Sequence, residues 1–145
     1  MKENSELVLH IYQDAEMACY TINKLLIDLK EKDNKIKRVV EDIYKEYEVW
    51  KQKSKEILKK EHAEISENPT IAKFMAGISI NKEVKSDNSD SSIADMLMQG
   101  ISMGSINMNK KIKTYEKEVS KSNLNMAKDF LKFQEKTIEI LKEYL

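Results

Sequence analysis

The chain has 145 residues, and its 25 basic and 25 acidic side chains give a formal net charge of zero. The two signs are interspersed, so no sustained basic surface is predicted to attract nucleic acid or an anionic membrane. Arg38 is the only arginine, and the bidentate contacts by which guanidinium groups read phosphates and bases are therefore nearly absent. We expect neither a nucleic acid nor a membrane as partner.

The composition favours a single all-helical domain. Hydrophobic residues make up 41% and charged residues 34%, with only 3 glycines and 1 proline. This balance is typical of long amphipathic helices, because sheets with tight turns need more glycine. The length suits one ordinary domain. We predict one all-α domain over residues 1–145, a four-helix bundle of two up-down hairpins joined by a long crossing segment.

In the first half of the chain, two helices are predicted at about residues 5–30 and 35–62. Stripes with alternating three- and four-residue steps occur in both. They are Val8, Ile11, Ala15, Ala18, Ile22, Leu25 and Leu29, then Ile36, Val40, Ile43, Tyr47, Trp50, Ser54, Ile57 and Glu61, where the second stripe is apolar except at Ser54 and Glu61. The polar break between them is short, which makes the pair antiparallel. Residues 63–90 form the crossing segment, with a short helix at 69–76 and a mobile polar loop at 81–90.

In the second half of the chain, apolar periodicity predicts helices at about residues 91–120 and 122–145. The first of them is expected to be capped by Ser91 or Ser92. Their stripes are Ile93, Leu97, Ile101, Gly104, Met108, Ile112, Tyr115 and Val119, then Leu124, Ala127, Leu131, Gln134, Ile138, Leu141 and Leu145. Glycine weakens a helix interior. The simplest interpretation of Gly100 and Gly104 is that they let a neighbouring helix, or an aromatic ring such as that of Trp50, approach this helix closely.

The same glycines lie among several methionines, a combination that also suits an adaptable contact surface. The predicted interface residues are Met96, Gly100, Met103 and Gly104. A haem or copper site at these methionines is disfavoured because the helix holds no histidine or cysteine.

Catalytic chemistry has little support in the sequence. Cys19 falls in an apolar pattern, and we expect a buried thiol in a reducing compartment. His10 and Asp14 are four residues apart, and the apolar stripe places them on the outer face of the first helix. There a surface hydrogen bond is a simpler interpretation than a metal site. His62 is expected near a helix end. The N-terminus resembles no signal or membrane segment, so the expected location is the cytoplasm.

Three glutamates at the margins of the predicted seams form the candidate metal site. They are Glu16, Glu46 and Glu135. Carboxylates inside a bundle are costly unless satisfied, so these three either gather as an oxygen-rich metal cluster or extend to water. No Glu-x-x-His pair of the kind used by di-iron bundles occurs. We expect no cofactor, with iron or another divalent metal as the alternative.

Several runs of the chain resemble a group of bacterial four-helix proteins that are similar to the ferritin-like superfamily. The runs are YQDAEMA (12–18), NPTIAKFM (68–75), IADMLMQGISMG (93–104), FQE (133–135) and LKEYL (141–145). The resemblance implies a ferritin-like bundle and, where ligands match, iron storage or oxidation. Glu16 is the one first-helix residue of matching type, and the usual ligand histidines are missing.

Two functions remain open at the level of the sequence. The first is a non-catalytic helical interaction or structural protein, self-associating as a homodimer or binding a protein partner through the methionine-rich helix. The second is a metal- or small-ligand-binding module of ferritin-like descent that uses the core carboxylates.

Overall fold

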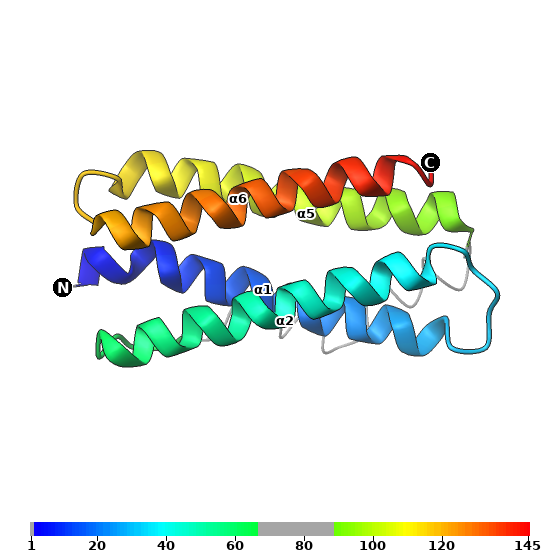
Figure 1. Cartoon of the computed structure of the whole chain (residues 1–145), viewed down its shortest axis with the longest axis horizontal. Coiled ribbons are helices and arrows are strands. Elements are labelled where there is room, and N and C mark those ends of the chain that lie inside the picture. The colour runs from blue at the N-terminus through cyan, green and yellow to red at the C-terminus, as the bar shows by residue number, and fades with distance from the viewer. Residues whose placement is uncertain (1, 67–88) are drawn as a thin grey trace.

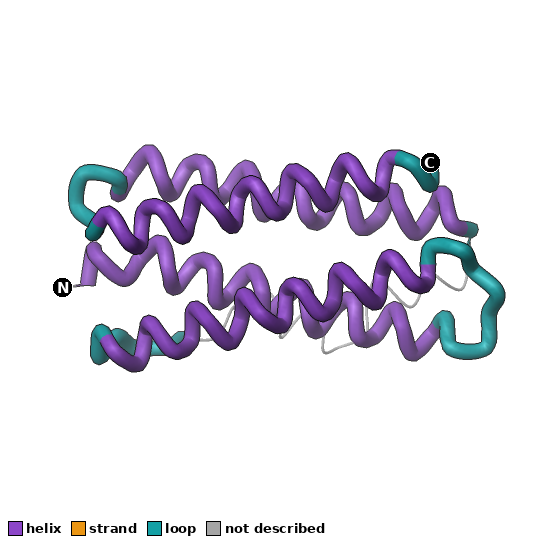
Figure 2. Tube along the Cα trace, in the orientation of Figure 1, coloured by secondary structure: helices purple, strands orange, loops and turns teal. Residues whose placement is uncertain are grey.

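The computed structural model describes residues 2–66 and 89–145, and within these ranges it contains helices and loops but no strand (Figure 2). The four helices are α1 (Lys2–Asp28), α2 (Lys37–Lys60), α5 (Asp90–Tyr115) and α6 (Lys121–Lys142). They confirm the predicted all-α four-helix bundle. None of these helices combines the length and the apolar character needed to cross a lipid bilayer.

The helices form two antiparallel hairpins, α1 with α2 and α5 with α6 (Figure 1). α2 ends at the opposite end of the bundle from the start of α5, so these two helices run in the same direction. This is the predicted crossing topology. The predicted short helix at 69–76 and most of the predicted loop at 81–90 lie outside the described residues.

The termini of the second hairpin differ from the predicted ones by a few residues. α5 ends at Tyr115, not near residue 120, because Ser120 is the N-cap of α6. The Ser120 hydroxyl accepts a hydrogen bond from the backbone N–H of Asn123 at 3.1 Å. α5 is capped by Ser89, not by Ser91 or Ser92. In both helices the serine that satisfies a first-turn N–H sets the start.

The core runs through the whole bundle, and α1 lies against each of the other three helices. The buried apolar residues of α1 are Leu7, Val8, Ile11, Tyr12, Ala15, Cys19, Ile22 and Leu25. A helix with three neighbours turns more than one face inward. Residues that a single amphipathic stripe places outside are therefore enclosed on α1, and this position creates the polar site described below.

An aromatic cluster joins α2 to α6. Tyr47 and Trp50 of α2 meet Phe130 and Phe133 of α6, with ring centroids 4.9 Å apart for Tyr47 and Phe133 and 5.3 Å for Trp50 and Phe130. Both pairs are edge-to-face, the arrangement favoured by the ring quadrupoles. Trp50 thus packs against α6, and the prediction that its ring approaches the glycines of α5 is wrong.

The buried row of α6 is rotated from the predicted stripe. Phe130 and Thr137 are buried, whereas Leu124, Leu131 and Ile138 are only partly buried against the core. Phe130 carries more apolar area than a leucine and meets the aromatic side chains of α2, so its burial sets the orientation of the helix.

Candidate functional site

A polar cluster lies inside the bundle where α1, α2 and α6 meet Gly104 of α5. Gln134 is fully buried, and its side-chain nitrogen donates one hydrogen bond to the Asp14 carboxylate at 2.7 Å. The same nitrogen lies 3.4 Å from the hydroxyl of Tyr47, which is also buried. We call Asp14, Tyr47, Gly104 and Gln134 the Gly104 cluster.

Glycine at position 104 creates the space for this cluster. A Cβ atom there would lie 2.5 Å from Oδ2 of Asp14 and 2.9 Å from Nε2 of Gln134. A side chain of any size would therefore displace the bonded pair. The predicted role of Gly104 in close approach holds, but the approaching groups are polar side chains from two helices. Gly100 has no atom within 4 Å of the corresponding position.

The Gly104 cluster holds more hydrogen-bond acceptors than donors. Among the described residues, Oε1 of Gln134 is buried without a partner. Burial raises the pKa of Asp14 from its ordinary 3.8 to about 6, and the hydrogen bond from Gln134 opposes part of this rise. A buried acceptor without a donor costs free energy. The cluster is therefore destabilising when Asp14 is ionised.

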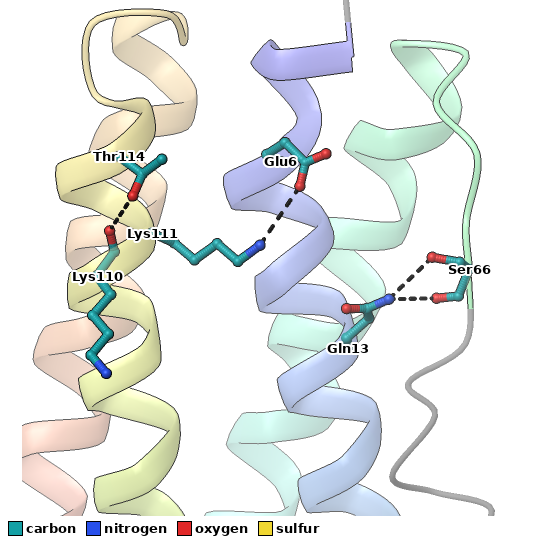
Figure 3. A network of polar contacts seen from close by, with 6 residues as sticks. All are labelled: Glu6, Gln13, Ser66, Lys110, Lys111 and Thr114. Carbon is teal, nitrogen blue, oxygen red and sulfur yellow. Dashed lines mark hydrogen bonds and ion pairs between the residues drawn. The ribbon is translucent and has the colours of Figure 1, made fainter.

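His10 lies at the edge of the Gly104 cluster, one turn before Asp14 on α1. Burial and the nearby Lys111 ammonium lower its pKa from 6.5 to about 4, partly offset by a backbone hydrogen bond with Gly104. Lys111 reaches from α5 to Glu6 of α1, with nitrogen and oxygen 3.8 Å apart (Figure 3). The imidazole is therefore neutral at neutral pH, and its Nε2 has no hydrogen-bond partner within the described part of the chain.

The prediction that His10 and Asp14 occupy the outer face of the first helix is therefore wrong. Asp14 follows Leu7 and Ile11 at four- and three-residue steps, so it belongs to a second inward row of α1. The sequence carried a signal for this site, because Gln134, Tyr47 and Gly104 all fall on predicted core stripes where polar or small residues are unusual.

The structure separates the three glutamates of the candidate metal site. Glu46 and Glu135 are exposed, and Glu16 is partly buried and accepts a hydrogen bond from the Tyr12 hydroxyl at 3.0 Å. In residues 2–66 and 89–145, no three histidine, cysteine, aspartate or glutamate side chains are grouped to hold a metal ion. Burial raises the pKa of Cys19 to about 12, so this thiol stays protonated at neutral pH.

The predicted interface residues divide into three kinds. Met103 is 63% exposed, and Gly100 is also on the surface. Met96 is partly buried and packs against the core. Gly104 is buried inside the bundle, and the prediction that places it on an interaction surface is corrected, because its open side faces Asp14 and Gln134.

An exposed, uncharged surface runs along α5. No charged residue occurs between Asp95 and Lys110. Met103 and Ile106, which are 63% and 53% exposed, are one turn apart in this stretch. We call this surface the α5 face, formed by Gln99, Gly100, Met103, Ile106 and Asn107. The equally exposed Val49 of α2 differs, because its neighbours on the helix surface are Lys45, Glu46, Gln52 and Lys53.

A second polar network closes one end of the bundle. The Glu61 carboxylate, at the end of α2, accepts hydrogen bonds from the side chains of Asn4 at 3.3 Å, Ser5 at 2.9 Å and Asn123 at 2.9 Å. Asn123 also donates to the backbone carbonyl of Asn4, whose side-chain oxygen accepts from the N–H of Ser120. We call these five residues the Glu61 cluster. It ties α1, α2 and α6 together.

A pocket of about 480 Å³ lies beside the Glu61 cluster, where the chain leaves α2. It is lined by Ser5, Glu6, Leu9, Glu61, His62, Ala63, Glu64 and Ser66. Gln13 of α1 holds one wall by donating to the backbone and side-chain oxygens of Ser66 (Figure 3). His62 adopts a left-handed backbone with φ 54°, the conformation in which helices commonly end. The carboxylates of Glu61 and Glu6 already have partners.

The chain matches no protein-family model, no curated protein and no solved structure. The resemblance to the ferritin-like superfamily and to bacterial proteins thus stays a hypothesis, and the four-helix bundle rests on the structure alone.

Proposed function

We propose that this protein is a non-catalytic helical interaction protein that self-associates through the α5 face. The observation that carries the proposal is the pair Met103 and Ile106, two large exposed apolar side chains on one uncharged helix surface. Adjacent exposed apolar groups of this kind mark contact surfaces. Gly100 belongs to the same face and is used by no contact within the described chain, although it weakens the helix.

A second copy of the chain is the partner that the charge distribution favours. In a two-fold symmetric interface both copies use the same surface, so a charge near the symmetry axis faces the same charge of the other copy. The α5 face carries no charge and meets its own copy without this repulsion. The absence of a side chain at Gly100 lets the second α5 helix approach closely beside Met103.

The decisive experiment compares two lysine substitutions of equal exposure by sedimentation over a range of protein concentrations. We expect wild type to associate with increasing concentration. Met103→Lys places one charge from each copy in the interface and weakens association by at least about tenfold, since an interface charge without a partner costs more than roughly 1.4 kcal/mol. Val49→Lys, at the same 63% exposed fraction, leaves association unchanged.

Two outcomes contradict the proposal. One is a wild-type protein that remains monomeric at every concentration. The other is an equal effect of Met103→Lys and Val49→Lys, which would locate association away from the α5 face. Circular dichroism of both variants checks that the helices are retained. We expect no loss of helix, because each substitution is at an exposed position and leaves the core intact.

A further inference from the structure

We propose that Asp14 is a proton-binding site of the folded protein, and that on acidification it pairs as a neutral carboxylic acid with the side-chain amide of Gln134. The inference concerns the interior of the bundle and is independent of self-association through the α5 face. One proton moves from solvent to the carboxyl group, and no other bond changes.

The hydrogen-bond inventory of the Gly104 cluster points to this proton. Nε2 of Gln134 already donates to Oδ2 of Asp14 at 2.7 Å, while Oε1 of the same amide is buried and has no donor within the described residues. An ionised carboxylate can only accept hydrogen bonds, but the neutral acid offers one O–H donor. Protonation therefore supplies the donor that the amide oxygen lacks, and acid and amide exchange two hydrogen bonds.

The groups packed around Asp14 do not compensate a negative charge. α6 contributes the neutral Gln134, α5 contributes Gly104, and α2 contributes Tyr47. Burial, together with the charge of Asp14, raises the pKa of Tyr47, so the phenol stays neutral. On α1 itself, His10 is neutral at neutral pH because of burial and Lys111. The described salt bridges do not include Asp14.

The enclosure of the carboxyl completes the case for a proton as the ligand. The position that a Cβ of residue 104 would occupy is within 3.0 Å of both carboxylate oxygens and of the Gln134 nitrogen. The side chains of Asp14 and Gln134 thus fill the space beside Gly104. A neutral Asp14 satisfies the site without another bound group. Burial sets the pKa of Asp14 at about 6, so uptake occurs as the pH falls from about 7 to 5.

The test is a carbon-detected NMR titration of the wild-type protein, with the side-chain signals of Asp14 and Gln134 followed together. We expect the Asp14 Cγ signal to titrate about two pH units above the aspartate signals of the same protein unfolded in urea. The Gln134 Cδ signal should follow with the same midpoint, because its oxygen gains a hydrogen bond in the same event.

Asp14→Asn is the matched variant, since it keeps the shape and removes the titrating group. It should abolish the inflection at Gln134. An Asp14 signal that titrates as in the unfolded chain overturns the proposal. A Gln134 signal that is silent through the Asp14 transition also overturns it, because the acid–amide pair would then not form. Both outcomes are read from wild type, so they hold even if the variant fails to fold.

Discussion

The Glu61 cluster and the Gly104 cluster both join helices of the bundle, but they differ in how completely their hydrogen-bonding groups are satisfied. In the Glu61 cluster one carboxylate accepts three hydrogen bonds at the end of the molecule, and Asn123 uses its amide nitrogen twice. In the Gly104 cluster the partly buried Asp14 carboxylate, midway along α1, has one amide donor, while the amide oxygen beside it is left without a partner in the described residues.

The difference separates a structural network from a site with another role. Buried polar groups normally have partners, and a satisfied network such as the Glu61 cluster contributes to stability and fixes the geometry of three helices. An unsatisfied buried group is uncommon and needs an explanation other than its contribution to stability. The unsatisfied Gly104 cluster is therefore the candidate for a role beyond folding, although the Glu61 cluster borders a pocket.

The largest effect is expected from Glu61→Ala. The substitution removes the common acceptor of the Asn4, Ser5 and Asn123 side chains, of which the last two are almost fully buried. We expect the free energy of unfolding to fall by about 2–4 kcal/mol, because buried donors are left without an acceptor. Urea denaturation followed by circular dichroism measures the change.

Glu64→Ala is the control for loss of a glutamate in the same segment. Glu64 is exposed, and its side chain makes no hydrogen bond with another described residue. We expect its unfolding free energy to stay within about 0.5 kcal/mol of wild type. Equal effects of the two substitutions would show that the Glu61 network does not stabilise the end of the bundle.

The two glycines of α5 give the next largest contrast. In Gly104→Ala the new methyl group would lie 2.5 Å from the Asp14 carboxylate. We expect a loss of about 1–2 kcal/mol from overpacking, despite the better helix propensity of alanine. In Gly100→Ala the methyl group enters open space. Here only the propensity changes, and stability should rise by roughly 0.5–1 kcal/mol.

Thermal unfolding of both glycine variants is the direct comparison. Opposite signs locate the packing constraint at residue 104 and exclude a general requirement for glycine in this helix. A stabilising effect at both positions would mean that the Asp14–Gln134 pair moves aside at little cost, so Gly104 would not be the residue that makes room for it.

The fold was predictable from the sequence because helical periodicity depends on local spacing. The stripes at Val8, Ile11 and Ala15 and at Ile36, Val40 and Ile43 match the buried faces of α1 and α2. Caps were harder, since several serines compete near each helix start and only the structure shows which one bonds the first turn.

The candidate site was only partly predictable, because a stripe assigns one buried face to each helix. Asp14 falls beside that face, and its burial depends on α1 having three neighbours, which is a property of the tertiary arrangement. Gln134 and Gly104 were assigned to the core correctly, but their partner was not. The spacing of Glu16, Glu46 and Glu135 placed them near seams, but Glu46 and Glu135 extend to water, whereas Glu16 stays partly buried beside Tyr12.

The effect that is smallest in wild type, and the most specific to the Gly104 cluster, comes from opposite pH dependences of Asp14 and His10. Asp14 has a higher pKa when folded, so its contribution to stability falls as the pH rises from about 4 to about 6. His10 has a lower pKa when folded, so its contribution is lost as the pH falls from 6.5 towards about 4. The windows overlap, and in wild type the two contributions largely cancel.

Single substitutions remove one side of this balance. The difference in unfolding free energy between Asp14→Asn and wild type should move in favour of the variant as the pH rises from 4 to 6. For His10→Asn it should move in favour of the variant as the pH falls from 6.5 to 4. Each difference should span at most about 3 kcal/mol, at about 1.4 kcal/mol per unit of pKa shift. Urea unfolding at several pH values provides both curves, and subtracting wild type cancels the shared titration of the surface carboxylates. If both difference curves are flat, neither side chain is shielded from water, and the Gly104 cluster is solvated like any polar surface.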